Sequence, residues 1–189
     1  MPVLYSTTKM TVDEFLSLPE ADEHLELVDG EIVVSPKPKT SHQILTSEIY
    51  MLLRQATKGL GRVVPEKELV VDSGVSENVR VPDLMYICED RKGIVFEDAI
   101  KGAPDIAIEV LSPSTEEVDR ISKRDEYEEA DVREYWIVDP EDRAVLVHDF
   151  KNETHQVYAG GDSYVSSVLA EQHIEAEFKV KNIFSILDK

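Results

Sequence analysis

The amino-acid sequence predicts an α/β or α+β fold, in which helices cover the faces of a central β-sheet. Two observations carry this prediction. Short apolar runs typical of strands recur along the chain, and two longer segments, 41–58 and 115–130, have the spacing of a helical face. With 189 residues, 42% of them hydrophobic, the chain can bury a core of ordinary size, and no repeat or linker divides residues 1–189. We expect one domain.

The composition excludes several classes of protein. The formal net charge is -19, from 39 acidic and 20 basic residues, and it opposes non-specific binding to a polyanion. A single cysteine, Cys88, cannot form an intramolecular disulfide and is typical of a reducing compartment. No stretch approaches 18 apolar residues, and the amino terminus lacks the pattern of a signal peptide. We therefore expect a cytoplasmic protein.

The first elements are a short helix and a hairpin. Thr11 and Glu14 have the spacing of a capping box, which predicts a helix through residue 18, where Pro19 follows. Residues 24–34 alternate around Asp29-Gly30, the strongest short signal for a β-hairpin.

A longer helix comes next. Over 41–58 the apolar residues recur at helical spacing: Leu45, Ile49, Leu52, Leu53 and Ala56. Two strand runs follow within 63–71, then a polar turn over 72–78. Residues 79–88 are predicted to form one buried strand that carries Asp83.

The stretch 103–115 is predicted to be a buried strand that carries one carboxylate and then breaks into a helix. The run 106–111 is too apolar for an exposed edge and too short for a helix. A lone ionised Glu109 there costs several kcal/mol unless it is paired or binds a metal. Ser114 and Glu117 have the spacing of a second capping box, which opens a charged helix that ends near Ala130.

Strands dominate the remaining chain. Residues 134–138 and 144–150 are predicted to form a hairpin around an Asp-Pro turn, and weaker alternation continues over 155–158 and 164–168. Trp136 is expected to pack in the core, as is the neighbouring tyrosine.

Two carboxylates are candidate metal ligands. Alternation along the strand places Asp105, Ala107 and Glu109 on one face. If the strand that carries Asp83 pairs with this one, Asp83 and Glu109 can converge on a hard cation such as Mg²⁺. The alternative is structural: Asp83 begins a strand after Pro82, and Glu109 is a core carboxylate paired with a lysine or arginine. Spacing alone does not choose between them.

A lysine on the charged helix is a third candidate. Asp119, Lys123, Tyr127 and Ala130 recur at positions that share one side of a helix. A lysine that points toward the sheet could neutralise charge on a phosphate or orient a water molecule. The alternative is an exposed ion pair between Asp119 and Lys123, worth a few tenths of a kcal/mol.

Ordered motifs along most of the chain carry a family resemblance. They are Glu26-Leu27-Val28-Asp29-Gly30-Glu31, His42 at a helix start, Val81-Pro82-Asp83, Ala103-Pro104-Asp105 through Glu109-Val110-Leu111-Ser112-Pro113-Ser114, Asp119 through Lys123 to Tyr127, and Glu134-Tyr135-Trp136-Ile137-Val138-Asp139-Pro140. The chain resembles the Uma2 family of bacterial proteins, related to the PD-(D/E)XK restriction-endonuclease-like nucleases. The resemblance implies a restriction-endonuclease-like central mixed β-sheet flanked by helices, with an N-terminal hairpin and C-terminal strands.

The resemblance also implies roles for individual residues. Asp83 is the PD aspartate and Glu109 the second acid, and with the backbone carbonyl of Val110 they would hold Mg²⁺ or Mn²⁺. Leu111 stands where the usual motif has lysine, and the resemblance assigns that role to Lys123.

Accessory roles follow from the same resemblance. Glu31 is a possible third acid and His42 a possible contact to phosphate or water. Strand alternation, which places Asp105 on the Glu109 face, indicates that Asp105 supports the site and is not itself a ligand. The alternatives are a solvated Glu31 and a His42 that pairs with local backbone. Asp131 stands where the family usually has glycine, and aspartate tolerates the left-handed helix end expected there.

Three functional interpretations compete. The favoured one is a metal-dependent endonuclease that hydrolyses DNA phosphodiester bonds. The others are a catalytically degenerate nuclease fold that serves as a binding protein, and an acidic regulatory protein that covers a partner's basic surface. A nuclease needs only a local basic rim, which five residues could supply: Lys37, Lys39, Arg54, Lys58 and Arg62. By analogy with nucleases that cut duplexes, we expect a homodimer.

Overall fold

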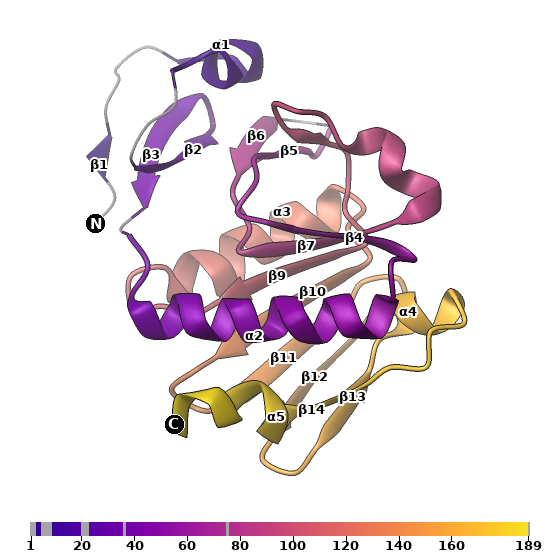
Figure 1. The fold of residues 1–189 in the computed structure, drawn as a ribbon. Helices are drawn as coiled ribbons and strands as arrows, with labels where there is room; N and C mark the ends of the chain where they lie inside the picture. Colours follow the sequence, from indigo (N-terminus) through magenta and orange to yellow (C-terminus); the bar gives the residue numbers. More distant parts are fainter. Residues whose placement is uncertain (1–2, 5–8, 20–22, 36, 75, 189) are drawn as a thin grey trace.

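The computed structural model describes residues 3–4, 9–19, 23–35, 37–74 and 76–188. Its strands form two six-stranded mixed sheets and one two-stranded ribbon (Figure 1). The first sheet has the order β1-β3-β2-β6-β5-β8: β1 (Val3–Leu4), β2 (His24–Val28), β3 (Glu31–Ser35), β5 (Leu69–Asp72), β6 (Glu77–Arg80) and β8 (Ile100–Lys101). The second has the order β12-β11-β10-β9-β7-β4: β4 (Gly61–Pro65), β7 (Leu84–Cys88), β9 (Ile106–Val110), β10 (Glu134–Asp139), β11 (Ala144–Asp149) and β12 (Thr154–Ala159).

The ribbon and the helices complete the fold. The ribbon pairs β13 (Ser163–Val165) with β14 (Glu177–Lys179). The helices are α1 (Val12–Leu16), α2 (Thr40–Thr57), α3 (Lys123–Glu129), α4 (Ser167–Glu171) and α5 (Val180–Phe184). A π-helical turn, η2 (Val118–Ser122), leads into α3, and two 3₁₀ turns are η1 (Glu89–Ile94) and η3 (Ser185–Asp188). Within the described residues, no helix has the length and apolar character needed to cross a bilayer.

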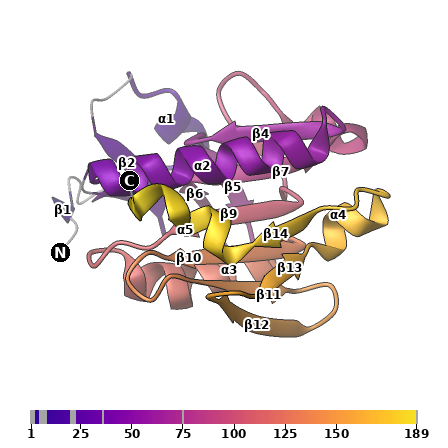
Figure 2. The same cartoon turned by 60° about the horizontal axis from the view of Figure 1, so that its bottom comes forward.

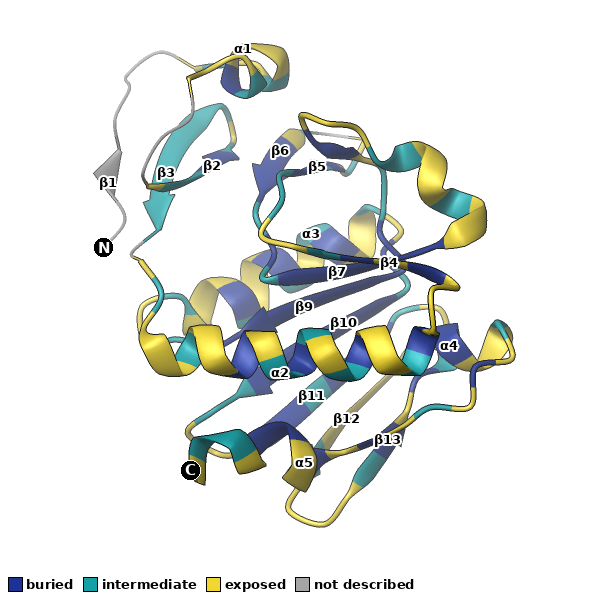
Figure 3. Cartoon of the chain, in the orientation of Figure 1, coloured by how far each residue is buried: buried dark blue, intermediate teal, exposed yellow. Residues whose placement is uncertain are grey.

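The second sheet is the centre of the molecule, with a hydrophobic layer on each face (Figures 2 and 3). On one face, Leu45, Ile49 and Leu53 of α2 pack on β7, β9 and β10 together with the C-terminal elements. On the other face, Tyr127 of α3 and residues of β5 and β8 pack on the same strands. The alternation predicted along β9 is therefore confirmed, because Ile108 lies in the first layer and Ala107 in the second.

Several predicted elements are confirmed. Thr11 and Glu14 form the capping box of α1, although the helix ends at Leu16. In the hairpin of β2 and β3, Asp29 and Gly30 have φ values of 51° and 79°, as a tight two-residue turn with this twist requires. Asp131 has a φ of 63°, the left-handed conformation expected after α3.

The predicted single strand over 79–88 is wrong. Residues 77–80 belong to β6 in the first sheet, whereas residues 84–88 form β7 in the second. The chain leaves one sheet and enters the other through Val81-Pro82-Asp83, because proline has no N–H to donate to a ladder. The Val81 N–H donates instead to the side chain of Glu26 at 3.1 Å. Asp83 therefore lies in a connection between the sheets.

Two further expectations need correction. No reciprocal bond between Ser114 and Glu117 occurs among the described contacts, and the Ser112 carbonyl instead accepts the N–H groups of Thr115 and Glu116. The helical segment that continues through η2 and α3 therefore begins at residue 116. At the C-terminal end, Val168 belongs to α4 and not to a strand, because Ser166 accepts a hydrogen bond from the Leu169 N–H and caps that helix.

Candidate active site

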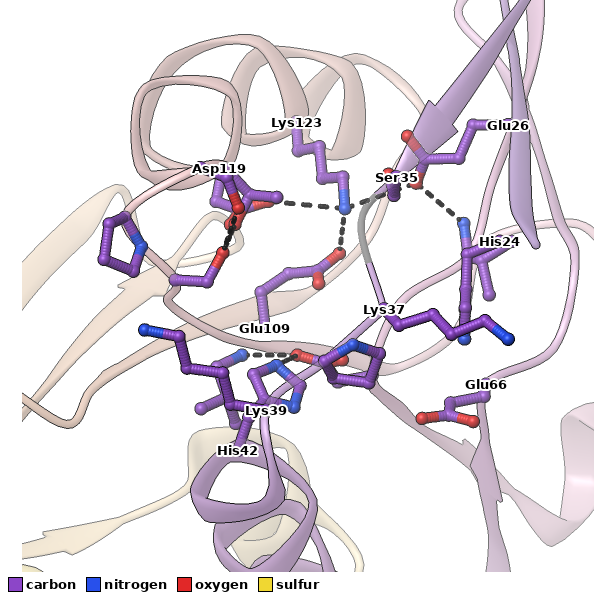
Figure 4. Close-up of a pocket in the computed structure, with 18 residues that line it drawn as sticks. His24, Glu26, Ser35, Lys37, Lys39, His42, Glu66, Glu109, Asp119 and Lys123 are labelled. Carbon is purple, nitrogen blue, oxygen red and sulfur yellow. Dashed lines mark hydrogen bonds and ion pairs between the residues drawn. The ribbon is translucent and has the colours of Figure 1, made fainter. Parts of the chain in front are cut away.

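A cavity of about 300 Å³ opens where the two sheets, the start of α2 and the η2–α3 helix meet. Its walls include Glu26 of β2, Asp83 of the connection between the sheets, Glu109 of β9, and Asp119 and Lys123 of the helix. Figure 4 shows Glu26, Glu109, Asp119 and Lys123 converging from elements that are far apart in the sequence. The cavity therefore brings together the three residues that the sequence singled out, with two more acids.

Lys123 lies at the centre of this cluster and is buried, with 6% of its surface exposed. Its Nζ donates a hydrogen bond to Glu109 Oε1 at 2.8 Å and lies 3.4 Å from Glu26 Oε1 and 3.3 Å from Asp119 Oδ1. The alternative of an exposed ion pair with Asp119 is therefore wrong. Burial opposes the charged form of Lys123, but the three acids outweigh that effect and hold its pKa well above the ordinary value.

The π-helical turn positions Lys123. The Lys123 N–H bonds to the carbonyl of Val118, five residues back, so the turn holds one more residue than an α-helical turn. The Asp119 carbonyl accepts a hydrogen bond from the buried Tyr135 hydroxyl at 3.0 Å. This contact ties the turn to β10 and directs the Asp119 and Lys123 side chains into the cavity.

Glu109 comes from the carboxyl end of β9 and is 4% exposed. Its Oε1 accepts hydrogen bonds from Lys123 and from the Tyr127 hydroxyl, the latter at 3.1 Å. Burial raises the pKa of Glu109 well above its ordinary value, and the charges of Asp119 and Asp83 add to the rise against the opposing effect of Lys123. Glu109 is thus a carboxylate with too little positive charge around it.

Asp83 points into the cavity because of the break between β6 and β7. Its Oδ2 accepts a hydrogen bond from the Val110 N–H at 2.6 Å, which fixes the carboxylate beside the end of β9. His42, in the first turn of α2, lies on the other side, with Nε2 3.1 Å from the same oxygen. Burial lowers the pKa of His42, but the contact with Asp83 outweighs it and the net shift is upward.

Glu26 is a site residue that the sequence reasoning missed as a candidate. It is 5% exposed, and besides Lys123 and the Val81 N–H it contacts Arg80 at 3.0 Å. Burial disfavours its charge, but Lys123 and Arg80 outweigh that effect and hold the pKa of Glu26 below its ordinary value. The signal was present in the sequence: a carboxylate between Leu25 and Leu27 stands out in an apolar strand as Glu109 does in β9.

Negative charge exceeds positive charge in this cluster. Among the described residues, five carboxylates (Glu26, Asp83, Glu109, Asp119 and Glu126) are joined through contacts to two permanent cations, Arg80 and Lys123, and to His42. Burial raises the pKa of Asp119, and Asp83 adds to that rise. A bound cation would relieve the repulsion that raises both the Glu109 and the Asp119 pKa.

The donor set fits a hard divalent cation held by two carboxylates. Within the described residues, the hydrogen bonds and ion pairs of Glu109 end at Oε1 and those of Asp83 end at Oδ2, which leaves the second oxygen of each for a ligand. Val110 also lines the cavity. No three His, Cys, Asp or Glu side chains form a ready-made metal cage in the described part of the chain. Two carboxylates, a carbonyl and retained water are the ligands that Mg²⁺ accepts.

Two accessory candidates are not brought to the site. Glu31 is half-buried in β3 and does not line the cavity. Asp105 lies at the opposite end of β9, where its carboxylate accepts hydrogen bonds from Arg91, Arg133 and the Cys88 N–H. Its proximity to Glu109 along the strand does not make it a neighbour of the cavity, because five residues of β-strand span about 13 Å between the first and last Cα.

The basic residues divide into two groups. Lys37 and Lys39 line the mouth of the cavity from the segment between β3 and α2 (Figure 4). Arg54, Lys58 and Arg62 are exposed but do not line it. Two of the five basic residues proposed for the rim therefore line the cavity, and three do not.

The fold and the site together define a class: a restriction-endonuclease-like mixed sheet with two acids and a lysine gathered at the end of a central strand. The chain belongs to the Uma2 family, whose model, described as "Putative restriction endonuclease", matches residues 12–177. A solved structure described as "a putative nuclease belonging to DUF820" from Anabaena variabilis ATCC 29413 has a TM-score of 0.78 and 24% sequence identity, and the match covers 94% of this chain and 99% of that one. The curated proteins contain no match. The predicted fold class and family are confirmed.

Proposed function

We propose that the protein is a metal-dependent endonuclease that hydrolyses phosphodiester bonds in DNA. One observation carries the proposal: Asp83, Glu109 and Lys123, from three separate elements, meet in one cavity with the Lys123 amine 2.8 Å from Glu109. This is the acid, acid and lysine set of the PD-(D/E)XK nucleases, with the lysine supplied by a helix. The description of the family as restriction endonucleases supports DNA as the substrate.

Each residue has a distinct task in this proposal. Asp83, Glu109 and the Val110 carbonyl would hold Mg²⁺ or Mn²⁺. When bound, such a cation polarises a phosphate oxygen and lowers the pKa of a water molecule. Lys123 carries a positive charge that is already buried, so little solvent reorganisation is needed for it to stabilise negative charge that builds on the phosphate. His42 holds the Asp83 carboxylate in place.

The mouth of the cavity suits a phosphate backbone in spite of the net charge of -19. Lys37 and Lys39 form one wall, and the hydroxyl groups of Ser112, Ser114 and Thr115 form part of the other. Lysines and hydroxyls are common phosphate contacts that carry no sequence information by themselves. The net charge of -19 opposes non-specific binding of DNA to the rest of the molecule.

The test is cleavage of plasmid and linear DNA with Mg²⁺ or Mn²⁺. Asp83→Asn and Lys123→Met should each lose about 100-fold or more of the activity, since each removes a charge from the reacting groups and keeps the side-chain size. Asp90→Asn and Lys181→Met are matched controls, because both residues are exposed and line no part of the cavity. They should cleave like wild type.

The same assay tests the alternative of a degenerate nuclease fold that binds a partner. One observation favours it: among the described residues, the Lys123 amine has three carboxylates as ion-pair partners within 4 Å, so the site neutralises its own lysine. Equal trace cleavage by wild type, site variants and control variants would identify a contaminant and reject the nuclease proposal.

A further inference from the structure

The sheet edges differ in how they are protected against pairing with other chains. Both edges of the first sheet, β1 and β8, are two residues long. At one edge of the second sheet, β4 carries Arg62 and ends at Pro65, two residue types that discourage a further strand. At the other edge, β12 is six residues long and contains no charged residue and no proline. Among the described edges of the two six-stranded sheets, only the β12 edge is left without such protection.

The β12 edge is also accessible from Thr154 to Val157, whereas at its end the Ala159 N–H donates to the Asp162 carboxylate at 3.0 Å. β12 pairs with β11 on one side, and Figure 2 shows it at the outer margin of the sheet. Thr154, His155, Gln156 and Val157 are all exposed, and Val157 is 59% exposed. A strand with an open edge presents unpaired backbone N–H and C=O groups to any strand that can approach. β12 is therefore a site for strand addition.

The net charge of the molecule favours an uncharged strand as the partner of β12. Two copies of a chain with a net charge of -19 repel one another over most of their surfaces. None of the six residues of β12 is Asp, Glu, Lys or Arg, in a chain of which 31% is charged. A second β12 can therefore lie against the first in any register without placing like charges opposite each other.

We propose that two copies of this chain associate through β12, in an antiparallel pair that joins their second sheets into one continuous sheet across a two-fold axis. Antiparallel pairing of identical strands is self-complementary, as a closed two-fold dimer requires. A six-residue strand gives an edge of about 20 Å. This surface is at the opposite edge of the sheet from β4 and does not involve the candidate active site, so the proposal is independent of the proposed function.

The charge also fixes how the dimer responds to salt. Long-range repulsion between the two copies is screened at high ionic strength, whereas hydrogen bonds between the strands are not. The dimer should therefore tighten as NaCl is raised from 50 to about 500 mM, with a screening length that falls from above 10 Å toward about 4 Å. A partner held by charge attraction, such as a basic protein, would show the opposite response.

Sedimentation equilibrium at 1 to 50 μM, with a two-fold change of mass as the readout, tests the proposal. Wild type should be dimeric, and Val157→Glu should weaken the dimer at least tenfold, because two buried like charges would lie near the axis. Val165→Glu is the matched control: Val165 is 55% exposed on β13, so it has the same residue type and exposure but lies on another strand. It should dimerise like wild type.

Hydrogen exchange at the two ends of the concentration range identifies the surface. The β12 amides should become protected at high concentration, and equal circular dichroism of both variants at 1 μM shows that the folds are intact. A monomeric wild type at 50 μM in high salt would overturn the proposal. So would a dimer that survives in Val157→Glu, or one that leaves the β12 amides unprotected.

Discussion

Two buried carboxylates, Asp105 directly before β9 and Glu109 near its carboxyl end, lie in different electrostatic environments. Asp105 is fully buried and Glu109 is 4% exposed, and alternation places them on the same face of the strand. Asp105 accepts hydrogen bonds from Arg91 at 2.9 Å, Arg133 at 3.2 Å and the Cys88 N–H at 2.8 Å. Glu109 shares a single lysine with Glu26 and Asp119.

The difference lies in the ratio of cations to carboxylates. Around Asp105 two arginines face two acids, because Arg133 also pairs with Glu171, so the charge is compensated and the site is complete without a ligand. Around Glu109 one lysine faces three acids, with Asp83 beside them, so a charge is missing. Burial of a carboxylate therefore does not by itself indicate a ligand site, and the local charge balance is the feature that separates these two residues.

The largest expected effect on stability comes from adding a divalent cation to the candidate site. Mg²⁺ or Mn²⁺ at 100 times its dissociation constant should stabilise the wild type by about 2.7 kcal/mol. For a chain of this size, that is roughly 5 to 10 °C in melting temperature. Glu109→Gln should lose this metal-dependent rise in melting temperature. Asp105→Asn should keep the rise, but its melting temperature without metal should be lower than that of the wild type. Calorimetry with EDTA and with each metal makes the comparison, and a wild type indifferent to both metals would remove the metal site from the proposal.

In the absence of metal, substitution of each of the two carboxylates should have a smaller effect on the free energy of unfolding, and the effect should differ between them. Asp105→Asn leaves Arg91 without its carboxylate partner, while Arg133 keeps Glu171, and it should cost about 2 kcal/mol of the free energy of unfolding, a value kept low because Arg91 is 34% exposed and Arg133 is 23% exposed. Glu109→Gln should cost nothing or stabilise, since Lys123 keeps Glu26 and Asp119 as partners.

Urea denaturation in EDTA measures both changes. A loss of stability in Glu109→Gln as large as that in Asp105→Asn would mean that Glu109 is an ordinary core ion-pair residue, and the contrast between the two ends of β9 would disappear.

The smallest effect is the pH dependence of the metal-free protein. The folded-state pKa of Glu109 is raised above its unfolded value of 4.5, so the folded state binds a proton that the unfolded state has released. The free energy of unfolding should therefore fall as pH rises from 4.5 through the raised pKa. Glu26 has the opposite sign, but its lowered pKa confines its contribution to pH values below 4.5.

Denaturation of the wild type and of Glu109→Gln from pH 5 to 8 in EDTA measures whether the free energy of unfolding falls as pH rises. His42, with a raised pKa, contributes in the same direction as Glu109, but it is present in both proteins and cancels when wild type is compared with Glu109→Gln. The variant should show the shallower decline. A decline of equal slope in both proteins would contradict the raised pKa of Glu109.

The sequence by itself determined the elements whose signals are local. The hairpin at Asp29-Gly30, the long helix α2 and the buried strand β9 follow from turn chemistry and hydrophobic period, which depend only on neighbouring residues. The same patterns singled out Glu109, because a charge in an apolar strand is anomalous wherever the strand lies. Helical spacing also placed Lys123 beside Asp119, but it left an exposed ion pair as the alternative, and the family resemblance assigned the role to Lys123.

Tertiary structure decided which partners those residues meet. Pro82 divides the predicted strand between two sheets, and this break, which no periodicity reveals, turns Asp83 toward the Val110 N–H. The third acid is Glu26 and not Glu31, because the pairing of β2 beside β6 sets which hairpin carboxylate faces Lys123. The charge balance that separates Glu109 from Asp105 is likewise a sum over residues distant in the chain. Local patterns fix what each segment is, while Coulomb interactions and burial depend on what the fold brings near.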